Sequence, residues 1–229
     1  MERSNHRRWT PTALLAFVAL LAGGAAHADV IYLSRNSLVS INHCDQNGPC
    51  SISAQATTTG LEEFNQNLSD PGFGNASQHS ILGPNRIMGN LSAGKTSLSD
   101  ARSTMTVQFT LAIPTYFTSS GQGSAFFDGG SATAQLTGPA GVVRLISDQQ
   151  SGGSTVLNFY NMTGLLNAGN YTLTLSAIAS GFRFSPGSNV NFNIDFTPVP
   201  LPAAGILLLS ALGGLGALKR ATRRASPAV

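Results

Sequence analysis

The sequence predicts an all-β protein: an antiparallel β-sandwich of jelly-roll type, with an N-terminal signal helix and a C-terminal transmembrane helix. Three observations predict this class. Apolar and polar residues alternate with a period of two, turns rich in Gly and Pro recur at short intervals, and no convincing amphipathic helix separates the strands. The 229 residues suffice for one sizeable domain with terminal segments. We divide the chain into residues 1–28, a β domain over 29–198 and a tail over 199–229.

The first 28 residues predict a cleavable secretory signal peptide. A basic start precedes an apolar run from Ala13 to Ala22, which is followed by the small residues Ala26 and Ala28. We predict cleavage before Asp29. The alternative, an uncleaved anchor, is disfavoured because this run is too short to cross a hydrocarbon layer of ~30 Å.

A disulfide is predicted between Cys44 and Cys50. The intervening segment contains Asn-Gly-Pro, which favours a turn that brings the two sulfurs together, and export favours oxidation. Closing this loop removes about 2.4 kcal/mol of conformational freedom from the unfolded chain. The alternative is a zinc site with His43 and His79, which lacks a second ligand pair at a recognisable spacing.

Three segments carry the clearest strand pattern. In Ser103–Ile113, Tyr171–Ala177 and Phe192–Phe196 every second residue is apolar, and most of the residues between them are Thr, Ser, Asn or Gln. Such strands bury one face. Weaker strand candidates are Val30–Leu33, Leu38–Asn42, Ile87–Leu91, Ser124–Phe127, Ser131–Thr137, Val142–Ser147 and Thr155–Met162.

These strands, separated by turn signals, predict a sandwich of about eight to ten strands. Only Leu61–Leu68 has a composition compatible with a short helix.

The tail has three parts in order. It begins with the motif Val199-Pro200-Leu201-Pro202-Ala203. From Ala203 to Leu218 the chain is uncharged, and as a helix this stretch is about 24 Å long, which is a short but adequate membrane span. The two prolines resist continuation of the helix outward and leave an extended segment that a protease can reach. A cationic cluster then holds the C-terminus in the cytoplasm and places the β domain outside; its members are Lys219, Arg220, Arg223 and Arg224.

This tripartite tail resembles the PEP-CTERM sorting signal, in its VPLPA variant, of Gram-negative bacteria that make extracellular polysaccharide. The resemblance implies that exosortase, a membrane cysteine transpeptidase, reads and cuts the tail, and that the passenger then reaches the cell surface or the extracellular matrix. The residues Ala225–Val229 beyond the arginines depart from the pattern. A plain C-terminal anchor would have the same topology, whereas a GPI signal normally ends with its apolar tail.

A softer resemblance covers part of the β domain. The run Leu165–Ser180, the segment Ser77–Ser80 and the strand TVQFTLAIP are similar to a recurrent class of passengers in this exported group, a class with no assigned chemistry.

The distribution of charge disfavours nucleic-acid binding. The formal net charge of +3 arises at the ends of the chain, since the region from Asp29 to Pro198 holds six basic and nine acidic residues. Six scattered cations cannot form the clustered basic face that displaces counterions from phosphates.

The sequence provides little support for catalysis. Nothing around Ser77, Ser80 or Ser154 resembles a nucleophile elbow, although His43 or His79 could serve as a base. We therefore expect no enzyme and no cofactor.

Two acidic features are also weak. Glu62 and Glu63 are adjacent and do not form the facing pair of a glycosidase. The residues Asp45, Asn47 and Gly48 faintly resemble a calcium loop whose other oxygen ligands are missing, so we expect no metal.

Sugar binding requires an exposed aromatic platform with polar neighbours. Trp9 leaves with the signal and Tyr171 begins an apolar face, so the candidate platforms are Tyr32, Tyr116 and Tyr160.

We therefore expect an exported protein that uses the secretion machinery, is anchored in the inner membrane before exosortase processing, and is then a structural or interaction protein associated with exopolysaccharide. The alternative is a carbohydrate-binding module acting on that exopolysaccharide.

Overall fold

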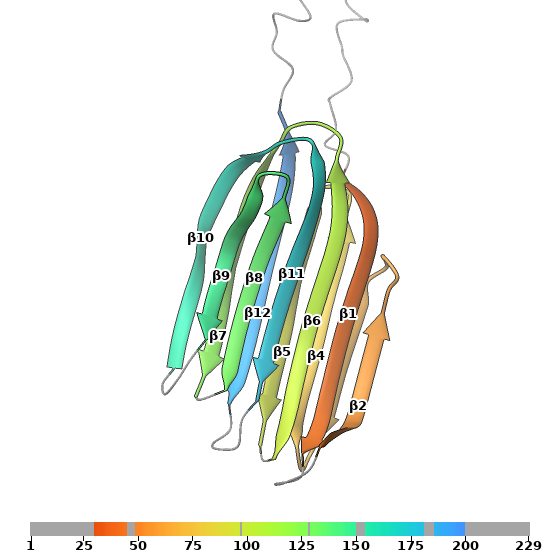
Figure 1. Ribbon diagram of the computed structural model, residues 1–229, viewed down its shortest axis with the longest axis vertical. Coiled ribbons are helices and arrows are strands. Elements are labelled where there is room, and N and C mark those ends of the chain that lie inside the picture. The colour runs from red at the N-terminus through yellow and green to blue at the C-terminus, as the bar shows by residue number, and fades with distance from the viewer. Residues whose placement is uncertain are drawn as a thin grey trace, which may run out of the picture.

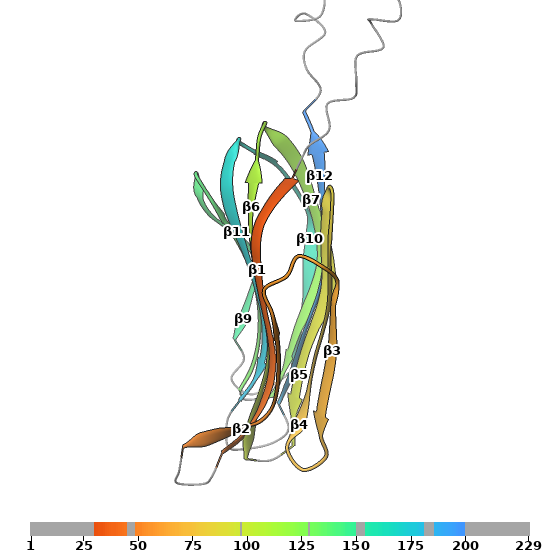
Figure 2. The same ribbon diagram turned by 90° about the vertical axis from the view of Figure 1, so that its right-hand side faces the viewer.

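The computed structural model describes residues 30–44, 49–96, 98–127, 129–149, 154–180 and 186–199. These residues form twelve strands in two antiparallel sheets that pack face to face, which confirms an all-β sandwich (Figures 1 and 2). Within these ranges no helix is long and apolar enough to cross a membrane. The predicted signal helix and transmembrane helix lie outside the described residues.

Each sheet has six strands. Sheet A has the order β2 (Cys50–Thr58), β1 (Val30–Cys44), β6 (Ser99–Leu111), β11 (Gly169–Ala179), β8 (Gly130–Gly138) and β9 (Gly141–Gln149). Sheet B has the order β10 (Ser154–Leu166), β7 (Thr115–Phe126), β12 (Gly187–Pro198), β5 (Arg86–Lys95), β4 (Gly74–Gly83) and β3 (Phe64–Asp70).

The chain alternates between the two sheets. From β5 to β12 every connection crosses to the other sheet, except for the β8–β9 hairpin within sheet A. The first four strands form two further hairpins, β1–β2 beside β6 and β3–β4 beside β5. The edges of the sandwich are therefore β2 and β9 in sheet A, and β3 and β10 in sheet B.

The core lies between the sheets and follows from the alternation in the strands. In β6, Met105, Val107, Phe109 and Leu111 point inward and are buried. The ring of Phe109 stacks on Tyr171 at 5.6 Å between centroids and meets Phe196 edge-on at 5.3 Å. Each fully buried side chain of this kind contributes about 1.5–3 kcal/mol of hydrophobic stabilisation.

Both described ends of the chain lie at the same end of the sandwich, which we call the terminal end (Figure 1). Val30 pairs with Leu111 at the end of β6, and Pro198 pairs with Thr115 at the start of β7. The amide of Val199 donates to the carbonyl of Pro114, at 3.4 Å, in the connection between these strands. The opposite end, which we call the disulfide end, lies about 45 Å away along β1.

Three expectations need correction. The predicted helix Leu61–Leu68 is wrong: β3 begins at Phe64, whose ring is buried, and pairs along its length with β4. Pairing with β4 satisfies the backbone of this Asn-rich segment, which has low helix propensity. The segments Val30–Leu33 and Leu38–Asn42 belong to one continuous strand, β1. The sandwich also has more than the eight to ten expected strands, because β2, β3 and β4 were missed.

Candidate functional site

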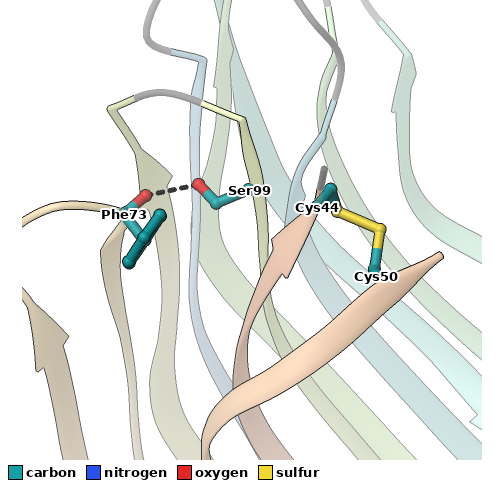
Figure 3. The surroundings of a disulfide bond; sticks show 4 residues. All are labelled: Cys44, Cys50, Phe73 and Ser99. Atoms are coloured by element: carbon teal, nitrogen blue, oxygen red, sulfur yellow. Dashed lines mark hydrogen bonds between the residues drawn. A yellow bond between two sulfur atoms is a disulfide. The ribbon is translucent and has the colours of Figure 1, made fainter. Parts of the chain in front are cut away.

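The predicted disulfide between Cys44 and Cys50 is confirmed, with an S–S distance of 2.03 Å (Figure 3). It joins the end of β1 to the start of β2, where the two cysteines are also partners in the strand ladder. Cys44 is buried, and its amide donates to the carbonyl of Leu98 at 2.9 Å. The Ser99 hydroxyl donates to the Phe73 carbonyl, as Figure 3 shows.

These bonds tie together connections from both sheets at the disulfide end. The amide of Thr96 donates to the Phe73 carbonyl at 3.1 Å, and the amide of Lys95 donates to the Pro186 carbonyl at 3.1 Å. The ring of Phe73 also meets that of His43 edge-on at 4.3 Å. The disulfide therefore adds a covalent link to an end of the sandwich that backbone hydrogen bonds already hold together.

The metal candidates do not come together. Asp100 lies close to Cys44 and Cys50, with ligand atoms within 4.8 Å, but the two sulfurs are bonded to each other and cannot act as thiolates. His43 and His79 lie on different sheets, in β1 and β4. The calcium-like residues at 45–48 lie outside the described part of the chain.

The catalytic candidates are paired in other ways. His79 lies 2.8 Å from the carboxylate of Glu63, and both side chains are exposed. The hydroxyl of Ser77 contacts that of Ser92 at 2.7 Å. Ser80 accepts a hydrogen bond from Gln78 at 3.1 Å. These two serines therefore contact Ser92 and Gln78, and neither of these contacts involves a histidine base.

A buried polar cluster between the sheets was missed from the sequence. Arg35 of β1 is only 1% exposed, and its guanidinium lies 5.8 Å from the centre of the Phe64 ring. Its Nε and Nη1 atoms have no hydrogen-bond partner among the described residues. Burial lowers the pKa of Arg35, and the charge of Glu62 raises it. Beside it, Gln78 donates to Ser37 at 2.9 Å.

One sequence signal could have found this cluster. Arg35, Ser37, Val39 and Ile41 occupy alternate positions of a single strand, so they share the face that the two aliphatic residues bury. Reading β1 as two short strands concealed this register.

The tyrosines differ in exposure. Tyr116 is 50% exposed on the outer face of sheet B, between Leu165 of β10 and Thr197 of β12. Tyr32 is half-buried. Its hydroxyl is directed at the β4–β5 turn, where it donates to the carbonyl of Gly83 at 2.7 Å and to that of Arg86 at 3.1 Å. Tyr32 is therefore no platform.

The other two tyrosines offer no described platform. Tyr171 is buried as expected, and its hydroxyl donates to the carbonyl of Asn167 at 2.8 Å. The side chain of Tyr160 lies outside the described residues. Tyr116 is therefore the predicted platform for which the structure supplies exposure, with Thr197 as a polar neighbour.

The sorting residues lie almost entirely outside the described part of the chain. Val199 is described and follows directly on β12. The remaining positions that the sequence singled out are not covered by the described ranges: Ala26, Ala28, Pro200, Leu201, Pro202, Ala203, Lys219, Arg220, Arg223 and Arg224.

Comparison with known proteins gives little. No family model and no curated protein matches the chain. A solved structure of the infectious bursal disease virus, Gt strain, is similar at 14% sequence identity with a TM-score of 0.22. The match covers 75% of this chain and 58% of the viral chain, so this chain spans less than two thirds of that protein.

Proposed function

We propose that this chain is an exported β-sandwich protein that exosortase processes and that acts at the cell surface or in the extracellular matrix as a structural or interaction protein. Its secretory signal precedes Asp29, and its VPLPA tail begins at Val199. The mature protein is associated with exopolysaccharide.

The position of the two chain ends is the observation that carries this proposal. Val30 and Val199 both lie at the terminal end of the sandwich (Figure 1). A membrane anchor that follows Val199 would therefore hold the terminal end toward the bilayer and direct the disulfide end outward. A disulfide at that end also agrees with an oxidising, extracytoplasmic location.

We also assign the sandwich to the jelly-roll type. The strand order β10-β7-β12-β5 facing β6-β11-β8-β9 supports this assignment, since it corresponds to the two interleaved Greek keys of an eight-stranded jelly roll. In this assignment β1–β4 are an addition at one edge.

Mass spectrometry of the protein from its native host tests the sorting proposal. We expect an N-terminus at Asp29 and a C-terminal region shortened within the tail in normal cells, and an intact tail in cells that lack the sorting protease. Full-length chain with residues 203–229 intact in the medium of normal cells would contradict the proposal.

A second candidate is a carbohydrate-binding module, which the exposure of Tyr116 favours. A half-exposed tyrosine with Thr197 as its partner on β12 can stack its ring on a pyranose ring. Pull-down on purified matrix polysaccharide tests this candidate. If Tyr116 is the binding platform, Tyr116→Ala abolishes saturable binding, whereas Phe126→Ala, at the other end of the same outward row of β7, retains it. Equal loss in both variants would reject Tyr116 as the platform.

A further inference from the structure

The outer face of sheet B carries two continuous rows of uncharged polar side chains that cross five strands. In the first row, Asn65, His79, Asn90, Asn191 and Gln122 are successive partners from β3 to β7. In the second row, the successive partners are Asn67, Ser77, Ser92, Asn189 and Ser124. We call these ten residues the amide face.

Charge is nearly absent from this surface. None of the ten residues is Asp, Glu, Lys or Arg, whereas charged residues normally make up about a quarter to a third of a protein surface. Of the neighbouring charged residues, Glu63 lies 2.8 Å from the ring of His79, a member of the face, and Arg86 pairs with Asp195 at 2.5 Å. A charged polymer would therefore find no unpaired counter-charge on the amide face.

Five of the ten side chains of the face form a hydrogen bond or contact with another described side chain. Asn90 donates to Asn189 at 3.3 Å, and the hydroxyls of Ser77 and Ser92 are in contact. In contrast, the side chain of Asn191 forms no hydrogen bond with any described residue, nor does that of Gln122. A primary amide offers two donors and one acceptor in a plane, so it can bind two neighbouring hydroxyls of one sugar at once.

We propose that the amide face binds a neutral polysaccharide chain that runs across the strands. Strands lie about 4.8 Å apart, so a row across five strands is about 19 Å long and presents one polar side chain at each step. This spacing is similar to the advance of an extended sugar chain per residue. The inference rests on the proposed association with exopolysaccharide, and it specifies the ligand as an uncharged polymer.

The composition of the face disfavours other macromolecules. The amide face would hold a sugar through hydrogen bonds from planar amides, and not through the aromatic platform expected from the sequence. It has none of the aromatic or arginine anchors that dominate the binding energy of protein interfaces. It also lacks the cations that nucleic acids require. Tyr116 lies six residues from Gln122 along β7, about 20 Å away, so the amide face and the Tyr116 platform are separate sites.

Affinity electrophoresis of the full-length chain in mild detergent tests the proposal. The gels contain hydroxyethylcellulose, dextran or galactomannan as neutral polymers, or alginate as an anionic one. We expect at least one neutral polymer to retard the protein, at low and at high salt. The double substitution Asn191→Ala/Gln122→Ala, which alters a directly paired couple, should weaken that binding by about tenfold.

The matched control lies on the opposite side of the molecule. Thr106 and Thr174 are also a directly paired couple, on the outer face of sheet A, and Thr106→Ala/Thr174→Ala should leave the affinity within about twofold. Urea unfolding of both double variants checks that each is folded.

The proposal would be overturned by no retardation by any neutral polymer, by retardation by alginate alone that salt removes, or by equal weakening in the two double variants. The sorting proposal does not depend on these outcomes, because tail cleavage is read separately by mass spectrometry. Loss of binding in Tyr116→Ala with an unchanged Asn191→Ala/Gln122→Ala variant would place sugar binding at the platform and reject the amide face.

Discussion

Replacing the buried Arg35 by methionine should stabilise the protein. The guanidinium is 1% exposed, and two of its N–H-bearing nitrogens have no partner among the described residues. Each buried donor without a partner costs about 1–3 kcal/mol. Methionine retains most of the apolar stem and removes these donors.

The opposing contribution is the contact between Arg35 and the ring of Phe64, at 5.8 Å. A cation–π contact contributes about 0.5–2 kcal/mol, depending on desolvation. The attraction to Glu62 is small because that carboxylate is exposed. The balance is a gain of about 1–3 kcal/mol in the free energy of unfolding for Arg35→Met.

Urea unfolding with the disulfide intact measures this difference as a shift of the midpoint at constant slope. The control is Arg102→Met on the exposed face of β6, which should change stability by less than about 0.5 kcal/mol. Arg35→Lys should be less stable than wild type, because a compact, strongly hydrated ammonium is harder to bury. A loss of more than about 1 kcal/mol in Arg35→Met would refute this reasoning and show that the guanidinium is a net stabilising group.

Three further predictions concern stability. Reducing the bond between Cys44 and Cys50 should lower the free energy of unfolding by about 2.4 kcal/mol, measured in urea with and without reductant, and an unchanged midpoint would contradict this. In Gly89→Ala the new methyl group would lie 2.3 Å from a backbone oxygen of β4, so we expect the free energy of unfolding to fall by about 1–3 kcal/mol. In the same assay Gly83→Ala, whose new methyl group would be 3.6 Å from its nearest neighbouring atom, should be close to neutral. Burial raises the pKa of Tyr32, so the contribution of the neutral hydroxyl to stability is complete below pH ~10 and is lost as the pH rises above that value. Between pH 8 and 11 the melting temperature should therefore fall less steeply with pH in Tyr32→Phe than in the wild type, and parallel curves would contradict this.

The strands that could be predicted from the sequence are those with apolar inward faces. In β6, β11 and β12 every inward position is apolar or a small residue, so the period of two is visible without a structure. In β4 the inward positions include Gly74, Gln78 and Ser80, and β2 is largely exposed on both faces. Such strands carry no apolar alternation, because ladder pairing rather than hydrophobic burial holds them in the sheet.

The candidate sites depend on register, which the sequence does not specify. The disulfide could be predicted because its two cysteines flank the turn-favouring sequence Asn-Gly-Pro. Asn65 and Gln122 are the two ends of the first row of the amide face, and only the pairing of three intervening strands places them in one row. Elimination among the tyrosines left Tyr32, Tyr116 and Tyr160 as candidate platforms, and the structure distinguishes the first two. The anchoring of Tyr32 to the β4–β5 turn depends on the packing of β1 against sheet B, which the sequence does not show.

The placement of β12 has a mechanical consequence. This strand lies in the interior of sheet B, paired on one side with β7 along its whole length and on the other side with β5, and the chain leaves it at Val199. A tether attached there would pull β12 along its own axis. The backbone hydrogen bonds to β7 and β5 would then be loaded together in shear, and would not break one after another. A protein tethered at β12 would therefore resist mechanical unfolding by fluid flow far better than one tethered at the edge strand β2.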